Sequence, residues 1–309
     1  MNTKNYIKLG GTLFIQATHK DLESVVRGVK YPHLKSVVID TEDGIRQEEL
    51  EQGLAQIKIL LENFCRSELL VFIRPRDSAV LKRVLDFKYI EFIDGFVLPK
   101  FSLENGLRYL ELLNNRSFLI MPSIEEKELF NPLHLRELCE LLLEYEEQVL
   151  SVRFGLEDML RVLKIRRKCN ESVFDIAVTS SVLGNFIAIF KSAGFNISGG
   201  VYPCYKDVEG LKADVKRDLK EGLFSKTIIH PKQIEIVHNL YKVDSSEYKE
   251  ALEILASTKA VFAQNDKMAE ISTMRPWAQE IVKRAEIYGV MAIIEKDLSK
   301  DTIESLSQV

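Results

Sequence analysis

The strongest constraint on the fold of this chain is a series of eight short apolar segments rich in β-branched and aromatic residues. They occupy residues 13–17, 36–40, 69–75, 95–100, 117–123, 149–155, 197–202 and 227–231. The apolar residues in these segments are continuous rather than alternating, which is typical of parallel strands covered on both faces. The sequence therefore predicts an α/β protein built on a parallel sheet.

The segments between these predicted strands have the periodicity of amphipathic helices. Leu50, Leu54, Ile57 and Leu61, for example, form one apolar stripe at helical spacing. The alternation of strand and helix spans residues 13–231, close to the ~250 residues of an eightfold barrel, so we predict a (β/α)8 TIM barrel. An open doubly wound sheet is less favoured, because no G-x-G-x-x-G motif follows the first strand.

The strand pattern stops after about residue 243. We therefore expect a barrel domain over residues 1–243 and a helical C-terminal appendage over residues 244–309, with helices near 246–261 and 276–289 joined by a polar connection. An appendage of this size is too small for an independent core, and barrel enzymes commonly close their mouths with an added segment. We expect it to act as a lid or an oligomerisation segment.

Composition argues against two classes of binding partner, membranes and nucleic acids. Hydrophobic residues make up 46% and charged residues 28% of the chain, and no apolar run is long enough to cross a membrane. Lysine and arginine total 42 against 46 acidic residues, without a basic block that would follow a phosphate backbone. We expect neither a membrane nor a nucleic-acid partner.

The four cysteines, at positions 65, 139, 169 and 204, lie far apart and form no C-x-x-C pair. We expect them to be reduced thiols. The N-terminal residues lack the apolar stretch and cleavage site of a signal peptide. Both observations predict a cytoplasmic protein.

Charged and polar residues follow the predicted strands. They are Asp40, Glu42, Asp43, Arg74, Lys100, Glu125, Glu157, Asp158, Tyr202 and His230. Because the carboxyl ends of barrel strands meet at one mouth, we expect these side chains to converge. Taken singly, each carboxylate is more often a helix cap than a metal ligand.

Two carboxylates on neighbouring strand ends, Glu125 and Asp158, form a more specific pattern. Carboxylate oxygens with open positions suit Mg²⁺, which keeps several waters and takes one or two protein carboxylates. An arginine nearby would hold a substrate carboxylate in a bidentate manner. This combination fits a metal-bound 2-oxo acid whose enolate is stabilised by the cation.

Seven motifs then carry a family resemblance. They are VVIDTEDGI (37–45), FIRPRD (72–77), DGFVLPK (94–100), PSIEE (122–126), RFGLED (153–158), VYPCYKDVEGL (201–211) and KTIIHPKQI (226–234). In order and spacing the chain resembles the citrate lyase beta subunit and HpcH/HpaI aldolase superfamily. Residues 267–290 are similar to the C-terminal segment of a branch of carbon–carbon bond lyases found beside tellurite-resistance and stress-response genes.

The resemblance implies roles for individual residues. Glu125 and Asp158 would coordinate Mg²⁺, with Mn²⁺ as a substitute ion, and Arg74 would bind the substrate carboxylate. The acidic residues Asp40, Glu42 and Asp43 would order metal waters or basic residues. Lys100 would pair with those acids, either as part of the catalytic machinery or as a structural ion-pair member. Gly155 and Tyr202 would lie against the substrate.

Further positions match the family less closely. His230 matches the I-H-P signature, although a core histidine that ties the last strand to its helix is the favoured interpretation. Glu270 corresponds to the acidic residue of the family's M-I-D motif and would act in trans as general base or lid contact in a homo-oligomer, a trimer or higher.

Two departures from the family concern the substrate. Gly11, Thr12 and Gln16 stand where relatives that use coenzyme A carry an arginine and a proline, so a coenzyme A thioester substrate stays an open alternative. Residues 198–200 replace an acidic group of the relatives.

The leading functional hypothesis is a Mg²⁺-dependent carbon–carbon bond lyase or aldolase acting on a 2-oxo acid or its adduct. The alternative is a non-catalytic component that binds the metal and the oxo acid within a biosynthetic or stress-response assembly. The sequence contains no Ser/His/Asp triad pattern, G-x-S-x-G elbow or Walker A loop that would favour acyl transfer or nucleotide hydrolysis.

Overall fold

The structure is a computed structural model that describes residues 5–264 and 267–291. The chain divides into two compact units, Met1–Leu240 and Tyr241–Val309. The boundary predicted from the sequence is at residue 243.

Seven parallel strands form the sheet of the first unit. They are β1 (Gly11–Gln16), β2 (Ser36–Asp40), β3 (Leu70–Arg74), β4 (Gly95–Leu98), β5 (Leu119–Ile124), β6 (Arg153–Phe154) and β7 (Lys226–Ile228). Their order is β6-β5-β4-β3-β2-β1-β7, so each strand from β1 to β6 joins the previous one and β7 pairs with the free side of β1. The predicted α/β class with a parallel sheet is confirmed.

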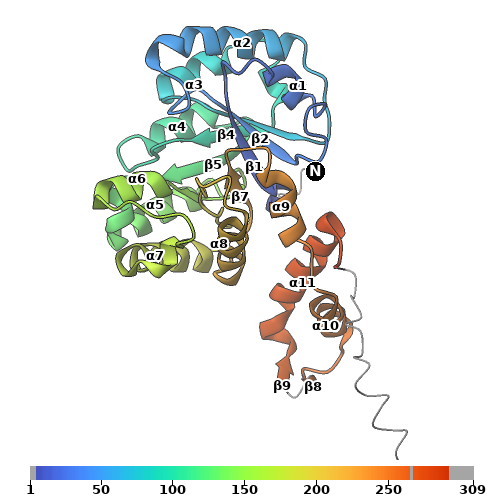
Figure 1. The fold of residues 1–309 in the computed structure, drawn as a ribbon. Helices are drawn as coiled ribbons and strands as arrows, with labels where there is room; N and C mark the ends of the chain where they lie inside the picture. Colours follow the sequence, from blue (N-terminus) through green and yellow to red (C-terminus); the bar gives the residue numbers. More distant parts are fainter. Residues whose placement is uncertain (1–4, 265–266, 292–309) are drawn as a thin grey trace, which may run out of the picture. The chain divides into compact units, whose positions relative to one another are not determined.

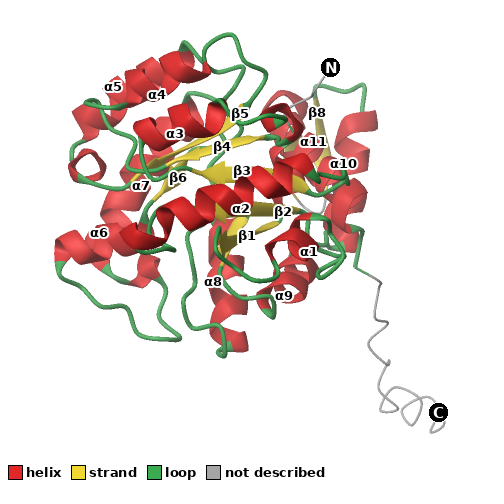
Figure 2. Cartoon of the chain, turned by 90° about the horizontal axis from the view of Figure 1, so that it is seen from above, coloured by secondary structure: helices red, strands yellow, loops and turns green. Residues whose placement is uncertain are grey.

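Helices follow the strands and lie outside the sheet (Figures 1 and 2). They are α1 (Leu22–Val26), α2 (Leu50–Glu62), α3 (Ser78–Leu85), α4 (Gly106–Leu113), α5 (Pro132–Leu143), α6 (Leu156–Leu163), α7 (Ala177–Ser192), α8 (Val208–Lys220) and α9 (Gln233–Leu240). Short 3-10 helices are η1 (Tyr6–Leu9), η2 (Gln47–Glu49), η3 (Ile90–Phe92), η4 (Lys127–Phe130) and η5 (Val173–Asp175). Among the described residues, no helix combines the length and apolar character needed to cross a membrane.

Side-chain caps fix where several of these helices begin. Asp77 and Asp207 each accept a hydrogen bond from the backbone amide three residues later, at 2.8 and 2.9 Å, and so cap α3 and α8. Asn131 caps α5, and Pro132 occupies its first turn, where a missing N–H leaves no helical bond unmade. These caps match the general expectation that polar residues after strands start the next helix.

The seventh predicted strand does not form a continuous strand in the structure. Within residues 197–202, only isolated parallel bridges form, between Val152 and Ile197 and between Gly199 and Lys226. The described sheet therefore has one strand fewer than the eight predicted. The physical reason is the local sequence, because Gly199 and Gly200 offer no side chains for cross-strand packing.

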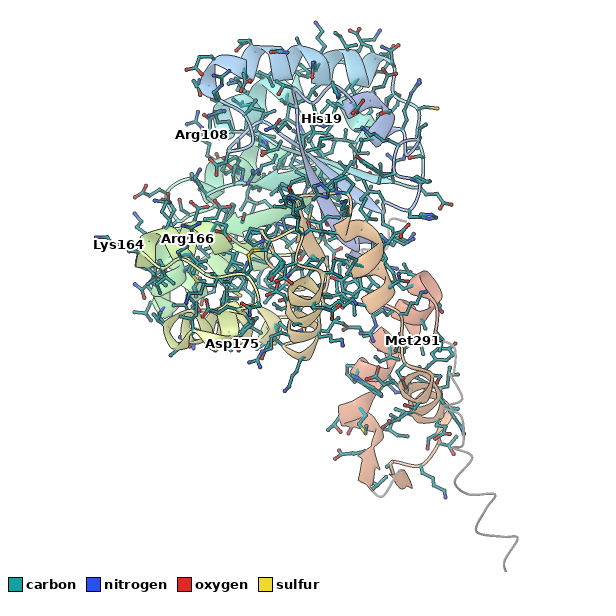
Figure 3. All side chains as sticks on the ribbon, in the orientation of Figure 1. His19, Arg108, Lys164, Arg166, Asp175 and Met291 are labelled. Carbon is teal, nitrogen blue, oxygen red and sulfur yellow. A yellow bond between two sulfur atoms is a disulfide. The ribbon has the colours of Figure 1, made fainter. Side chains whose placement is uncertain are left out.

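An apolar cluster occupies the inward face of the sheet. It consists of Leu9, Val38, Phe72, Val97, Met121 and Leu150, with Phe14 packed against it. Side chains two residues apart on a strand share a face. Asp40, two residues beyond Val38, and Arg74, two residues beyond Phe72, therefore stand on the same face as the cluster and at the carboxyl ends of their strands. Figure 3 shows how densely side chains fill the spaces between the elements.

The second unit contains two helices and a hairpin. They are α10 (Ser245–Ala256), β8 (Val261–Gln264), β9 (Lys267–Glu270) and α11 (Ile271–Tyr288). The helices share a core of Val243, Ala251, Ile254, Ala278, Ile281 and Ala285. The polar connection predicted between the helices is instead this antiparallel hairpin, and α11 starts before Pro276 rather than at it.

A buried ion cluster joins β7 to α8. The Lys226 ammonium lies 2.5 Å from Asp214 Oδ2 and 2.6 Å from Asp218 Oδ2, and all three residues are buried. Arg167 Nη1 lies 3.4 Å from the other oxygen of Asp214. Removal of one member leaves uncompensated charge in a medium that solvates it poorly.

We expect Lys226→Met to lower the free energy of unfolding by about 3–5 kcal/mol, because two buried carboxylates lose their shared cation. Arg83→Met is the matched control, since Arg83 pairs with Glu51 on an exposed surface and its loss should cost no more than about 1 kcal/mol. Urea unfolding of both variants measures the difference, and equal costs would contradict this account of the cluster.

Candidate active site

The carboxyl ends of β2 and β3 are joined by an ion pair. Asp40 and Arg74 are register partners and the last residues of their strands. Arg74 Nε donates to Asp40 Oδ1 at 2.7 Å and Nη2 donates to Oδ2 at 2.6 Å. The backbone amides of Glu42 and Gly44 donate to the same carboxylate, at 3.0 and 2.9 Å. A side chain at Gly44 would meet Asp40, because a Cβ there would lie 2.4 Å from Oδ2.

Glu42 extends this ion pair to a second cation. Its Oε2 lies 3.1 Å from Arg74 Nη1, and its Oε1 contacts the Lys100 ammonium, which is also 3.4 Å from Asp43 Oδ1. Burial raises the pKa of Glu42, and the charges of Arg74 and Lys100 oppose that rise. Burial alone would lower the pKa of Arg74, but its bonds to Asp40 raise it above the ordinary value. Five of the predicted residues, Asp40, Glu42, Asp43, Arg74 and Lys100, therefore form one connected network.

Glu125 follows β5 directly and is 2% exposed. Its Oε2 atom is buried and makes no hydrogen bond within the described structure. Burial raises the pKa of Glu125 to about 7, and the nearby charges of Glu42 and Asp158 contribute to the rise. A buried carboxylate oxygen without a donor is costly, so this atom is a candidate metal ligand.

Gly155 has a steric role beside Glu125. A Cβ at position 155 would lie 2.4 Å from Glu125 Cγ, so only glycine allows the two strand ends to approach this closely. In the structure Gly155 lies against the Glu125 side chain, and its predicted contact with the substrate stays a prediction.

Asp158 lies in the first turn of α6 and does not cap it. Its Oδ1 accepts hydrogen bonds from Arg161, at 3.0 Å from Nη2 and 3.3 Å from Nε, and the side chain is 23% exposed. No group of three or more His, Cys, Asp and Glu side chains suited to a metal occurs among the described residues. A cation here would depend on two carboxylates, with water and substrate completing its shell.

Arg153, on β6, is a residue that the sequence reasoning missed. It is 5% exposed, and its terminal nitrogens donate to Ser198 Oγ at 3.2 Å and to Thr227 Oγ1. Burial and, to a smaller extent, the neighbouring charge of Arg74 lower its pKa to about 10, while the charge of Glu125 opposes this shift. The available signal was a single cation inside an otherwise apolar predicted strand.

Two predicted residues lie in other surroundings. The Tyr202 hydroxyl donates to Asp207 Oδ2 at 2.6 Å and accepts from the backbone amide of Asn170 at 2.9 Å, so its polar group is engaged in loop structure. His230 is half-buried rather than a core residue, and its ring stacks on Tyr205 with 4.3 Å between centroids.

Glu270 ends β9 in the second unit and is exposed. Its Oε1 accepts a hydrogen bond from Ser272 Oγ at 2.7 Å. The structure therefore corrects the expectation that Glu270 lies in a loop, because the chain before it pairs as a strand.

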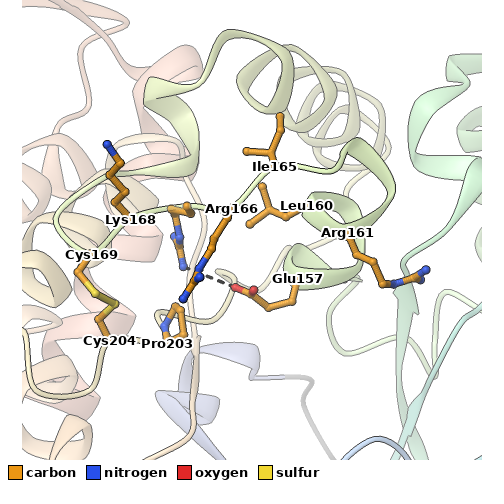
Figure 4. A pocket seen from close by; sticks show the side chains of 10 residues that line it. Glu157, Leu160, Arg161, Ile165, Arg166, Lys168, Cys169, Pro203 and Cys204 are labelled. Atoms are coloured by element: carbon orange, nitrogen blue, oxygen red, sulfur yellow. Dashed lines mark ion pairs between the residues drawn. A yellow bond between two sulfur atoms is a disulfide. The ribbon is translucent and has the colours of Figure 1, made fainter.

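A pocket of about 930 Å³ lies beside α6. It is lined by Glu157, Leu160, Arg161, Ile165, Arg166, Arg167, Lys168, Cys169, Pro203 and Cys204. The dashed line in Figure 4 marks the ion pair of Glu157 Oε1 with Arg167 Nη2, 3.9 Å apart, while Arg161 points away from Glu157.

A disulfide between Cys169 and Cys204 forms part of the wall of this pocket. The prediction that all four cysteines are reduced thiols is therefore wrong for this pair, and Cys65 and Cys139 are free. The sequence spacing did not predict this disulfide, because 35 positions separate the two cysteines and only the fold brings their loops together.

The chain resembles known proteins in sequence over most of its length. A family model described as C-C_Bond_Lyase of the TIM-Barrel fold matches residues 3–290. A (3S)-malyl-CoA thioesterase of Cereibacter sphaeroides is 35% identical over 65 residues, 21% of this chain and 23% of that protein. The citrate lyase subunit beta of Escherichia coli is 24% identical over 151 residues, 47% of this chain and 48% of that protein. The chain thus spans 23% of the length of the first of these curated relatives and 48% of the length of the second.

Solved structures resemble the fold over most of its length. A citrate lyase from Burkholderia xenovorans superposes with a TM-score of 0.72 at 16% identity, covering 93% of this chain and 94% of that one. The CitE protein of Mycobacterium tuberculosis, in complex with magnesium, acetoacetate and coenzyme A, gives a TM-score of 0.66 at 20% identity, covering 90% and 98%.

The contact between Gly155 and Glu125 generates a test. We expect Gly155→Ala to lower the melting temperature, because the added methyl group must displace Glu125 or its own strand. Gly184→Ala is the control, since a Cβ at that position of α7 meets nothing within 4 Å and alanine favours the helix by about 0.4–1 kcal/mol. Thermal unfolding should separate the two variants in opposite directions, and an unchanged Gly155→Ala protein would contradict the steric assignment.

Proposed function

Because the chain belongs to the carbon–carbon bond lyase family of the TIM-barrel fold, we propose that it is a Mg²⁺-dependent lyase or aldolase acting on a 2-oxo acid or its adduct. The observation that carries this proposal is the buried Glu125 oxygen without a hydrogen-bond donor, close enough to Asp158 for the two charges to interact. The name of the citrate lyase relative supports the reaction class.

Closure of the barrel is part of the proposal. Residues 197–200 supply the eighth strand, between β6 and β7. The two isolated bridges support this assignment, because one leads to Val152 beside β6 and the other to Lys226 of β7. The side chain of Arg153 supports it as well, since it donates to Ser198 and Thr227 on both sides of the gap.

Glu125 and Asp158 would hold the metal. Their oxygen atoms suit a hard divalent cation, and the unpartnered Oε2 of Glu125 gives it a coordinating atom that no protein group occupies. When bound, Mg²⁺ supplies positive charge that polarises a 2-oxo group and favours its enolate. Arg161 would be released from Asp158 or share that carboxylate with the ion.

Arg74 would bind the substrate carboxylate. A guanidinium has five N–H groups, and the bonds to Asp40 and Glu42 leave donors on both terminal nitrogens of Arg74. Asp40 fixes the plane of this fork, so we assign it as a positioning residue. Glu42 connects Arg74 to Lys100 and keeps both cations at the mouth. Lys100 then contributes positive charge at the substrate-facing end of β4.

We assign the general base to Glu270 of a neighbouring subunit. The protein would then be a homo-oligomer, a trimer or higher. We place this homo-oligomer in the cytoplasm. The exposed carboxylate of Glu270 supports a contact outside its own unit.

The second half of the substrate is either a coenzyme A thioester, as in the named malyl-CoA relative, or a free acid. Assays of malyl-CoA and of free 2-oxo acid adducts with the same preparation distinguish these two substrates.

The metal assignment is tested by calorimetry with Mg²⁺. We expect Asp158→Asn and Glu125→Gln each to abolish measurable binding, since a neutral amide is a poorer ligand for a hard cation. Asp43→Asn is the matched control, because it removes a charge near the mouth that pairs only with Lys100 in the described structure. Wild-type Mg²⁺ affinity in Asp158→Asn would reject the site. Release of pyruvate or glyoxylate from candidate adducts then separates a lyase from a protein that only binds the acid.

The role of Glu270 is tested by mixing subunits. Asp158→Asn and Glu270→Gln proteins are expected to be inactive alone, and activity should return when the two are mixed under conditions of subunit exchange, because each supplies what the other lacks. Full activity of Glu270→Gln by itself would remove the residue from the reaction.

A further inference from the structure

Arg153 is a buried cation that forms no ion pair within the described structure, and Glu125 is the anion that acts on it from beyond contact distance. Among the described residues its donors reach the hydroxyl groups of Ser198 and Thr227 and, at 3.9 Å, the Met121 sulfur, and no carboxylate lies within ion-pair distance. Burial of a charged group costs several kcal/mol unless an opposite charge compensates it. An isolated guanidinium is therefore an unusual component of a barrel interior, and the neutral hydroxyls around it offset only part of the cost.

Arg153 lies on the strand next to that of Glu125, the proposed metal ligand, and two residues farther from the carboxyl ends of the strands. Ser123 and Arg153 are register partners on β5 and β6, and Glu125 and Gly155 each follow two residues later. The Phe14 ring lies beneath two cations, with the Arg74 and Arg153 guanidinium carbons 5.1 and 5.2 Å from its centroid. Arg153 therefore sits beside Arg74 on one aromatic surface.

Residues beside Arg153 are partly exposed to solvent. Gln16, at the end of β1, is exposed, and Phe14 on the same face is only partly buried. Thr227, which accepts the Arg153 hydrogen bond, is also partly buried. A small ligand that enters between the strand ends would thus meet Phe14 and Thr227 beside the guanidinium.

The balance of charge indicates what such a ligand carries. Asp40 and Glu42 are compensated by Arg74 and Lys100, and Asp158 is compensated by Arg161. Asp43 also contacts Lys100, but its side chain is 60% exposed and its charge is screened by solvent. Among the buried groups this leaves Glu125 and Arg153, which carry opposite charges, so the buried part of the mouth is neutral before a divalent cation binds. With that cation it carries two positive charges, which a dianion neutralises.

Resting on the function proposed above, we propose that Arg153, Ser198 and Thr227 form a second carboxylate site that selects 2-oxo dicarboxylic acids over 2-oxo monocarboxylic acids. One carboxylate and the oxo group lie at Arg74 and the metal ligands, and the distal carboxylate pairs with Arg153. Because the hydroxyls already orient the guanidinium, little side-chain entropy is lost when the distal carboxylate binds. Arg153 is a substrate-binding residue in this account and takes no part in proton transfer.

The experiment compares two ligands of similar shape, oxaloacetate and 2-oxobutyrate, which differ by a carboxylate in place of a methyl group. Calorimetry in Mg²⁺ measures the affinity of each for wild-type protein, Arg153→Met and the charge-matched control Arg83→Gln, which alters an exposed pair between α2 and α3. We expect Arg153→Met to lose about 10- to 100-fold in oxaloacetate affinity, as for a charge-assisted hydrogen bond, and less than about twofold in 2-oxobutyrate affinity. Arg83→Gln should match wild type for both.

Stability gives an independent readout. In the absence of ligand, Arg153→Met should melt no earlier than wild type, because it removes an uncompensated buried charge and keeps an apolar side chain of similar length. A lower melting temperature with unchanged discrimination between the two acids would make Arg153 a structural residue and overturn the proposal. If Arg153→Met does not fold, Arg153→Lys keeps the charge but loses the fork, and its preference for oxaloacetate should fall at least about fivefold.

Failure of the proposed function and failure of the Arg153 assignment give different results. If wild-type protein binds neither acid in the presence of Mg²⁺, the proposed function fails. If wild type binds both acids with equal affinity, or Arg153→Met keeps the wild-type preference for oxaloacetate, the function stands and the assignment of Arg153 is wrong.

Discussion

The period of two along a β-strand is the constraint on which both the core and the candidate site depend. Each inward-facing position of the first unit is separated from the next by one residue that faces the helices. Val38 is followed by Asp40 and Phe72 by Arg74, so the same strands that build the apolar cluster also carry the charges above it. A shift of one residue in register would turn both sets outward together. The packing of the core and the position of the chemistry therefore cannot vary independently.

Ionic groups in this mouth are arranged so that one residue orients the next. Asp40 receives two backbone amides as well as the two donors of Arg74, and Glu42 lies between Arg74 and Lys100. Multiple fixed bonds of this kind hold a guanidinium in one plane, which a single surface ion pair does not. Glu125 differs from these acids because, within the described structure, its buried Oε2 has neither a hydrogen-bond donor nor an ion-pair partner, whereas Glu42 Oε2, which also lacks a hydrogen bond, lies 3.1 Å from Arg74 Nη1. The contrast between acids paired with a cation and one acid without such a pair distinguishes the positioning groups from the proposed ligand.

Much of this arrangement could be predicted from the sequence, because apolar runs and the charges that follow them are local features. The α/β class and the positions of Asp40, Arg74 and Glu125 at strand ends came from such runs. Three features depend on contacts between distant segments and were not predictable in this way. Gly155 is required because a side chain there would collide with Glu125. The seventh predicted strand forms no continuous hydrogen-bond ladder at Gly199 and Gly200. Cys169 bonds to Cys204 only because the fold brings two loops together. Arg153 was visible as a charge in an apolar run, but its lack of a counter-ion was not.

The disulfide has a mechanical consequence for the weakest part of the sheet. Residues 197–199 are held to their neighbours by isolated bridges rather than by a continuous ladder of hydrogen bonds. Cys204 follows this segment closely, and Cys169 follows α6, the helix that carries Asp158. A covalent link therefore spans the seam where backbone pairing is thinnest, and it encloses α7 within the loop that it closes. Separation of the two edges of that seam requires chemistry on sulfur as well as the loss of hydrogen bonds, which makes its opening sensitive to the redox potential of the surroundings.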